Sequence, residues 1–281
     1  LQAEDMASVA QDTDTLASVS LMDLSVEAEA FGATVRYADN EVPAVTGQFI
    51  ADEDAADSLK IPKVGDARTG VCVEAIRLAK ARIKGKPVFA GIIGPYSLAG
   101  RLMDVTEIMY ACYDEPDMVK RVLDKAAQFL VSYAKAMKDA GADGVVMAEP
   151  LAGLLSGEMV SAFSVPYVKR IIDEVQTDDF AVIYHNCGSV MNTLGKIFSQ
   201  NAAAYHFGNA VKMDEVLKNA PATALCMGNV DPAGQFAQGT PESIRERTLD
   251  LMARGAGYEN FLPSSGCDIP AHASWKNIDA F

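Results

Sequence analysis

The chain has 281 residues, of which 49% are hydrophobic and 22% are charged, and its formal net charge is -14. This apolar content excludes an intrinsically disordered chain, and no uninterrupted apolar run reaches the roughly 18 residues that a membrane-spanning helix needs. Because 38 acidic residues outweigh 24 basic ones, nucleic acid is not expected as a partner, since phosphate binding requires a basic surface.

The five cysteines are widely spread, without the even count and regular spacing of a secreted disulfide framework. This pattern favours a reducing, cytoplasmic setting. The chain opens at Leu1 without a methionine, so the missing signal-peptide pattern is weak evidence on targeting. We therefore expect a cytoplasmic protein and leave its biological start open.

The first half of the chain carries several separate patterns. Residues 15–22 form an apolar run typical of a buried strand, and residues 33–45 alternate apolar and polar positions like a small hairpin. Residues 86–93 predict a strand that runs into a Gly-Pro pair. Apolar residues three to four apart predict an amphipathic helix over 117–139, which ends at Gly141.

From residue 144 onward the predicted strands and helices alternate regularly. The strands are 144–148, 180–184, 202–207, 223–227 and 258–262, and the helices lie within 157–176, 189–199, 212–220 and 240–255. Pro166 interrupts the first of these helices, and Thr240-Pro241 opens the last with a capping hydroxyl.

Repeated strand–helix units with apolar strands predict a parallel α/β sheet covered by helices, in a single domain spanning residues 1–281. A (β/α)8 TIM-type barrel is the first interpretation, and an open doubly wound sheet is the second. Neither of the glycine-rich motifs that bind nucleotide phosphates occurs at a strand end, so nucleotide binding has no motif support.

Polar residues gather where the predicted strands end, which is where parallel α/β folds place their sites. Two of the three histidines and two of the five cysteines belong to this set. The strand ends read Glu149-Pro150, His185-Asn186-Cys187-Gly188, His206-Phe207-Gly208-Asn209, Gly228-Asn229-Val230-Asp231-Pro232 and Ser264-Ser265-Gly266-Cys267-Asp268.

Three of these residues suggest a metal site. His185 and Cys187 are two positions apart, so in an extended backbone their side chains point to the same side. Cys267, at another strand end, could complete the site across the barrel mouth. One histidine and two cysteines suit zinc, and three protein ligands leave one position open, as in catalytic zinc sites. The alternative is two packed cysteines and a hydrogen-bonded histidine.

Several motifs together resemble the uroporphyrinogen decarboxylase superfamily, and within it the branch of methylcobamide:thiol (coenzyme M type) methyltransferases. The motifs are MDLSVEAEAFGA (22–33), GPYSLA (94–99), AEP (148–150), HNCG (185–188), GNVDP (228–232) and SSGCDIP (264–270). The resemblance runs from residue 22 to the C-terminus and implies a (β/α)8 barrel. It also implies additional residues before the first strand, so we expect a truncated N-terminal segment.

The resemblance implies that His185, Cys187 and Cys267 hold Zn²⁺ and that the zinc activates a small acceptor thiol such as coenzyme M. The thiolate would attack the methyl group of a methylcorrinoid, which a separate corrinoid protein presents at the barrel mouth. Some members carry an acid where Gly208 and Asn209 stand here, so an acidic fourth zinc ligand from that loop is not expected, and His206 or Glu149 could take its place.

Further candidates complete the predicted site. Glu149 could accept the thiol proton or touch the metal, with a charge at a helix N-terminus as its alternative, and His206 is expected in the pocket as a second catalytic residue. The expected substrate-binding residues are Asp23, Tyr96, Asn209 and Asp231. Asp231 lies in a turn-forming stretch, and Tyr96 lies at an expected helix start, so both also have structural interpretations.

Other functions remain open at this point. A metal-free decarboxylase-like lyase would need arginines for a polyanionic substrate, and Arg36, Arg68 and Arg101 are the early candidates. A branch that methylates tetrahydrofolate lacks the zinc triad. A non-catalytic corrinoid- or metal-binding module is the third alternative. The sequence identifies neither the thiol nor the oligomeric state.

Overall fold

Seven parallel strands form the central sheet of the computed structural model, which describes residues 1–281. In spatial order they are β1 (Ser18–Val19), β4 (Val88–Ile93), β5 (Gly144–Ala148), β6 (Ala181–Asn186), β7 (Ala204–Phe207), β8 (Leu225–Val230) and β9 (Phe261–Ser265). The spatial order follows the chain order without a reversal. A doubly wound sheet reverses at a switch point, so that second interpretation is wrong.

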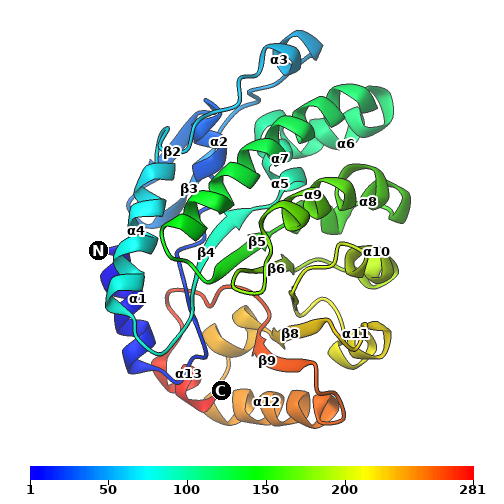
Figure 1. Cartoon of the computed structure of the whole chain (residues 1–281). Helices are drawn as coiled ribbons and strands as arrows, with labels where there is room; N and C mark the ends of the chain where they lie inside the picture. Colours follow the sequence, from blue (N-terminus) through cyan, green and yellow to red (C-terminus); the bar gives the residue numbers. More distant parts are fainter.

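The sheet curls and carries its helices on the outside, which is the predicted TIM-type architecture (Figure 1). The structure differs from an eight-stranded ring because seven strands pair and β1 does not pair with β9. β1 has only two residues of the predicted strand 15–22. The apolar run there is not buried, since Leu16 and Leu21 are 66% and 69% exposed.

Along the chain, the first helix precedes the first strand, the last helix follows the last strand, and the other helices lie between strands. The helices are α1 (Gln2–Asp12), α2 (Val26–Ala30), α3 (Glu53–Ser58), α4 (Thr69–Arg82), α5 (Pro95–Met103), α6 (Val105–Asp114), α7 (Pro116–Asp139), α8 (Gly157–Phe163), α9 (Val165–Val175), α10 (Leu194–Phe198), α11 (Met213–Asn219), α12 (Pro241–Gly255) and α13 (Trp275–Ala280). None of them is both long and apolar enough to cross a membrane.

Several local predictions are confirmed. The hairpin consists of β2 (Val35–Ala38) and β3 (Glu41–Val45), which pair antiparallel. The helix predicted to break near Pro166 is observed as two helices, α8 and α9. They are separated at Ser164, two residues before the proline, where the backbone is not helical. Thr240 caps α12, where its hydroxyl accepts a hydrogen bond from Ser243 N at 3.2 Å.

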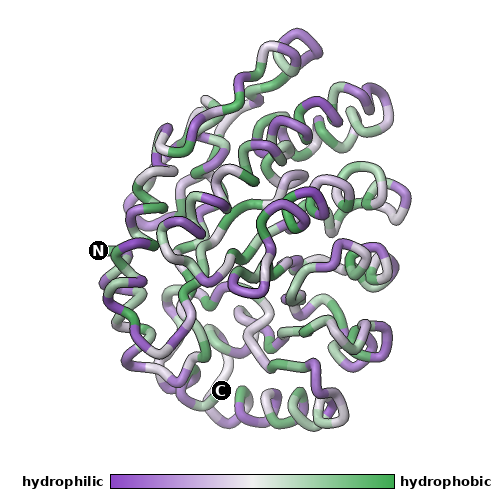
Figure 2. The backbone as a smooth tube through the Cα atoms, in the orientation of Figure 1, coloured by the Kyte–Doolittle hydropathy of each residue, from purple (hydrophilic) through white to green (hydrophobic).

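The hydrophobic core lies between the sheet and its helices. Along the outer helices, hydrophobic and hydrophilic residues alternate (Figure 2). The buried side of α7 carries Val122, Phe129 and Tyr133, and the helix-facing residues of β6, Val182 and Tyr184, are also buried. The residues between them point to the inner side of the curled sheet.

The inner side holds one layer of residues that prepares the site. Ala148, His185, His206, Met227 and Leu262 are register partners on five successive strands. Register partners in a parallel sheet point to the same face. The two histidines are therefore neighbours because of strand pairing, although they are 21 residues apart in sequence.

Candidate metal centre

Three side chains meet beyond the carboxyl ends of β6 and β9. His185 is the second-to-last residue of β6, Cys187 directly follows that strand, and Cys267 lies two residues after the end of β9. Their ligand atoms all lie within 4.8 Å of one another. His185 Nε2 is 3.5 Å from Cys267 Sγ. The imidazole is buried and both thiols are half-buried, so a small ligand can reach the cluster from the side of the thiols.

Close backbone packing brings these loops together. A Cβ atom at Gly208 would lie 2.6 Å from Cys187 Cα, and one at Gly266 would lie 2.8 Å from Asn209 N. Only glycine fits such approaches. Asn186 bends the chain before Cys187, because its side-chain oxygen accepts a hydrogen bond from Gly188 N at 2.8 Å. The two loops that carry the thiols are thus held on either side of the segment after β7.

The two thiols share a hydrogen bond, which separates their acidities. The hydrogen bond from Cys267 lowers the pKa of Cys187 to about 6, against the opposing effect of burial. The same hydrogen bond raises the pKa of Cys267 to about 12. Thiolate is the form of cysteine that binds metal ions, so the lowered pKa of Cys187 favours the form that a metal site needs.

His206 contacts His185 on the side away from the thiols. His206 Nδ1 lies 2.8 Å from His185 Nδ1, and His206 Nε2 lies 2.7 Å from the carbonyl oxygen of Ser265. Burial, together with the neighbouring His185, lowers the pKa of His206 to about 4. His206 is therefore neutral at physiological pH and touches the cluster through His185.

The triad fits zinc in its donor chemistry, and the distance between two of its ligand atoms matches a zinc site. With Zn–N near 2.0 Å and Zn–S near 2.3 Å, neighbouring N and S ligands at the corners of a tetrahedron lie about 3.5 Å apart. The distance between His185 Nε2 and Cys267 Sγ has that value, at 3.5 Å. One imidazole nitrogen and two thiolates also form the borderline-soft donor set that zinc prefers.

The structure places Glu149 and Tyr96 at the start of α5, outside this cluster. Glu149 Oε2 accepts a hydrogen bond from Tyr96 N at 3.0 Å, and Oε1 accepts one from Ser97 N at 2.6 Å. Complete burial raises the pKa of Glu149 to about 7. The phenol of Tyr96 is buried against Met109 Sδ at 3.3 Å. Both carboxylate oxygens of Glu149 are thus occupied by backbone amides.

Asp23 belongs to an ion-pair network at the other end of the rim. Its carboxylate accepts hydrogen bonds from Ser25 N at 2.9 Å and Ser25 Oγ at 2.7 Å, and it pairs with Arg68. Arg68 also pairs with Glu29 at 2.6 Å. Asp23 therefore neutralises an arginine, and that arginine has little charge left for a polyanionic substrate.

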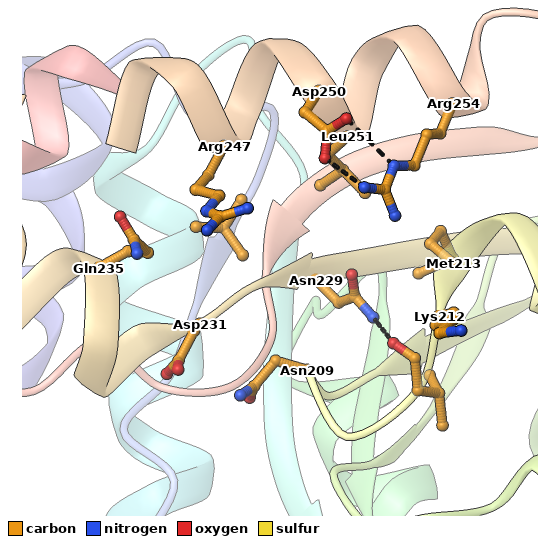
Figure 3. A pocket seen from close by; sticks show the side chains of 12 residues that line it. Asn209, Lys212, Met213, Asn229, Asp231, Gln235, Arg247, Asp250, Leu251 and Arg254 are labelled. Atoms are coloured by element: carbon orange, nitrogen blue, oxygen red, sulfur yellow. Dashed lines mark hydrogen bonds and ion pairs between the residues drawn. The ribbon is translucent and has the colours of Figure 1, made fainter. Parts of the chain in front are cut away.

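Asn209 and Asp231 line a cavity of about 380 Å³ between β8, α11 and α12, which none of the three metal-site residues lines (Figure 3). Asp231 Oδ1 accepts hydrogen bonds from Ala233 N and Gly234 N, both at 3.0 Å, so it also stabilises a turn. Arg247 and Arg254 enter the cavity from α12.

Sequence reasoning missed the charged lining of this cavity. Arg247, Asp250 and Arg254 stand three and four residues apart, which places them on one helix face. Asp250 pairs with Arg254 at 2.6 Å. Helical spacing of charges was the available signal, although it is equally typical of a solvated helix.

The chain belongs to the uroporphyrinogen decarboxylase (URO-D) family, because the profile of that family matches residues 6–281. This confirms the family resemblance that the motifs carried. The fold and the strand-end site described above are therefore those of a URO-D family member.

Two curated relatives bear different names. The methylcobamide:CoM methyltransferase MtbA of Methanosarcina acetivorans is 29% identical over 284 residues, which cover 98% of this chain and 82% of the relative. A uroporphyrinogen decarboxylase of Desulfotalea psychrophila is 29% identical over 277 residues, which cover 92% of this chain and 79% of the relative. Overall identity therefore does not separate the two activities.

A solved structure confirms the fold. A methyltransferase from Methanosarcina mazei superposes with a TM-score of 0.90 at 22% identity, over 99% of this chain and 82% of the solved one. At this identity the similarity concerns the fold alone. The assignment of an activity has to come from the site residues.

Proposed function

We propose that this chain is a zinc-dependent methyltransferase that moves a methyl group from a methylated corrinoid to a small thiol such as coenzyme M. The observation that carries the proposal is the convergence of His185, Cys187 and Cys267, whose ligand atoms lie within 4.8 Å of one another. The name methylcobamide:CoM methyltransferase, borne by relatives such as MtbA, supports this pair of substrates.

His185 Nε2 and the two cysteine sulfurs would hold the zinc and leave one position for the acceptor thiol. Zinc bound there would lower the pKa of the acceptor thiol, so that a thiolate exists at neutral pH. Cys187 and Cys267, as two thiolates, would offset the charge of the ion, and the acceptor sulfur would stay electron-rich.

The transfer forms an S–CH₃ bond while the Co–CH₃ bond breaks. Both electrons of the broken bond stay with cobalt, which becomes cob(I)amide, and the proton of the acceptor thiol leaves to solvent. The half-buried thiols allow the corrinoid to approach from the rim. A corrinoid protein docking over that rim, and a single domain spanning residues 1–281, are parts of the same proposal.

Glu149 and the alternative decarboxylase function have less support than the triad. Glu149 stays a predicted proton acceptor, but its backbone hydrogen bonds favour a structural contribution to α5. The decarboxylase alternative has less support, because two of its three early arginine candidates are already paired: Arg68 with Asp23 and Glu29, and Arg36 with Glu41 at 3.2 Å.

The test is a methyl-transfer assay. Zinc-loaded protein, methylcobalamin and coenzyme M are mixed without oxygen, and cob(I)alamin is followed by its absorbance. We expect turnover by the wild type and loss of it in Cys187→Ser. Cys72→Ser is the matched control, because Cys72 is also half-buried but lies on α4 outside the cluster. Wild-type turnover by Cys187→Ser, or no turnover by any zinc-loaded protein with a panel of thiols, would contradict the proposal.

A further inference from the structure

The ring nitrogens of His206 have partners of different kinds. Nε2 lies 2.7 Å from the carbonyl oxygen of Ser265. A carbonyl oxygen only accepts hydrogen bonds, so His206 Nε2 carries a proton. A neutral imidazole has a single N–H group, and Nδ1 of His206 is therefore the unprotonated acceptor nitrogen.

The same reasoning fixes the tautomer of His185. His185 Nδ1 lies 2.8 Å from His206 Nδ1 and 3.2 Å from the carbonyl oxygen of His206. Both of these partners accept, so His185 Nδ1 carries the proton and donates to them. In a neutral His185 the lone pair then resides on Nε2, the nitrogen that lies 3.5 Å from Cys267 Sγ.

We propose that His206 is a positioning residue that holds His185 in the Nδ1–H tautomer and so presents Nε2 of His185 as a metal ligand. The inference rests on the proposed function only in that it takes the triad to be the metal site. A hydrogen-bond partner on the second nitrogen commonly sets the tautomer and ring orientation of a metal-binding histidine.

The hydrogen bonds from Ser265 through His206 to His185 form a relay, which also links the strands that carry the ligands. Ser265, the last residue of β9, precedes Cys267 by two positions, and its carbonyl holds the ring of His206 on β7. His206 in turn holds His185 on β6. The backbone of Ser265, which leads into Cys267, is thereby connected through the imidazoles of His206 and His185 to His185 Nε2, the nitrogen 3.5 Å from Cys267 Sγ.

The experiment compares His206→Leu, which removes both hydrogen-bonding nitrogens, with His206→Gln, whose amide can accept from His185 and donate to Ser265. His272→Gln is the matched control, because His272 is exposed outside the relay. Zinc affinity is measured by competition with a chelator, after circular dichroism and thermal melting show that the metal-free variants are folded. We expect His206→Leu to bind zinc about 10- to 100-fold more weakly. His206→Gln should recover most of this loss, and His272→Gln should bind like the wild type.

A second measurement keeps the inference testable without metal. In ¹⁵N NMR spectra of the histidine-labelled, metal-free wild type, His185 should show a protonated Nδ1 and an unprotonated Nε2. Unchanged zinc affinity in folded His206→Leu, or His185 protonated on Nε2, would overturn the inference. A wild type that binds no zinc yet shows the Nδ1–H tautomer would instead count against the proposed function.

Discussion

Two parts of the same rim use polar residues in opposite ways. At the ends of β6 and β9, the side chains of His185, Cys187 and Cys267 face one another, and their ligand atoms lie within 4.8 Å of one another. At the ends of β4 and β5, the carboxylate of Glu149 is bonded by two backbone amides. A polar residue at a strand end is therefore a stronger candidate ligand where its ligand atom converges with those of other side chains than where backbone amides bind it.

Glu27 is a second buried carboxylate, near β4. Glu27 Oε1 accepts a hydrogen bond from Ile93 N at 3.0 Å, while Oε2 has no partner. Burial raises the pKa of Glu27 to about 7. Both glutamates thus lie in the interior, so their protonation affects the stability of the fold.

The largest expected effect is the loss of metal from Cys267→Ser. We expect about one zinc per chain in the wild type and almost none in this variant, because a single imidazole and one thiolate hold zinc poorly. The half-exposed thiol contributes little to packing, so the metal-free variant should lose less than about 1 kcal/mol of stability. Elemental analysis measures the zinc content, and thermal melting measures the stability. A Cys267→Ser protein with full zinc content would contradict the view that the cluster at the ends of β6 and β9 is a metal site.

Glu149→Gln should show the opposite pattern. The amide group of glutamine would face either Tyr96 N or Ser97 N and leave a buried donor without an acceptor, which costs about 1–3 kcal/mol. Zinc content should not change. The control is Glu158→Gln at the start of α8, where the side chain is exposed. A stable Glu149→Gln protein with impaired methyl transfer would restore Glu149 as a catalytic residue.

Glu27→Gln should change how stability depends on pH. The pKa of Glu27 is raised from 4.5 to about 7 in the folded chain, so the folded state binds the proton more tightly than the unfolded state. Its ionisation therefore lowers stability as the pH rises from about 4.5 to 7. The shift corresponds to at most about 3 kcal/mol. We expect Glu27→Gln to be the more stable protein at pH 8 and to converge with the wild type below pH 5.

Denaturant unfolding at several pH values measures this difference. Parallel stability profiles for the two proteins between pH 5 and pH 8 would mean that Glu27 is not held neutral by burial. The relevant residue would then have to be sought elsewhere among the buried acids.

The smallest effect is expected from Arg247→Ala in the cavity beside α12. The side chain is exposed, so the change in stability should stay within about 0.5 kcal/mol. The KM for the thiol should not change, since none of the metal-site residues lines this cavity. A several-fold increase in KM would instead place the charged end of the acceptor there and revive Asn209 and Asp231 as substrate-binding residues.

Much of the fold could be predicted from the sequence, because buried apolar residues recur with the period of the helix or strand that carries them. The strand 144–148 and the helix 117–139 have almost the observed bounds, with β5 at Gly144–Ala148 and α7 at Pro116–Asp139. The prediction failed at residues 15–22, where an apolar run lies largely on the surface. Helices α1 and α4 were also missed.

Side-chain partners were harder to predict because they come from distant parts of the chain. Glu149 is bonded to an amide 53 residues away, and His206 to a carbonyl 59 residues away. Strand-end position brought His185, Cys187 and Cys267 into one hypothesis. It could not show that backbone amides at the start of α5 bind the carboxylate of Glu149, while the thiols converge on His185.

The most direct test of the central claim is zinc K-edge X-ray absorption on the purified protein, prepared without a histidine tag. We expect zinc with two sulfur ligands and at least one nitrogen ligand, and one further sulfur after coenzyme M is added. Zinc surrounded only by nitrogen and oxygen, or a sulfur count that does not change with the thiol, would contradict it.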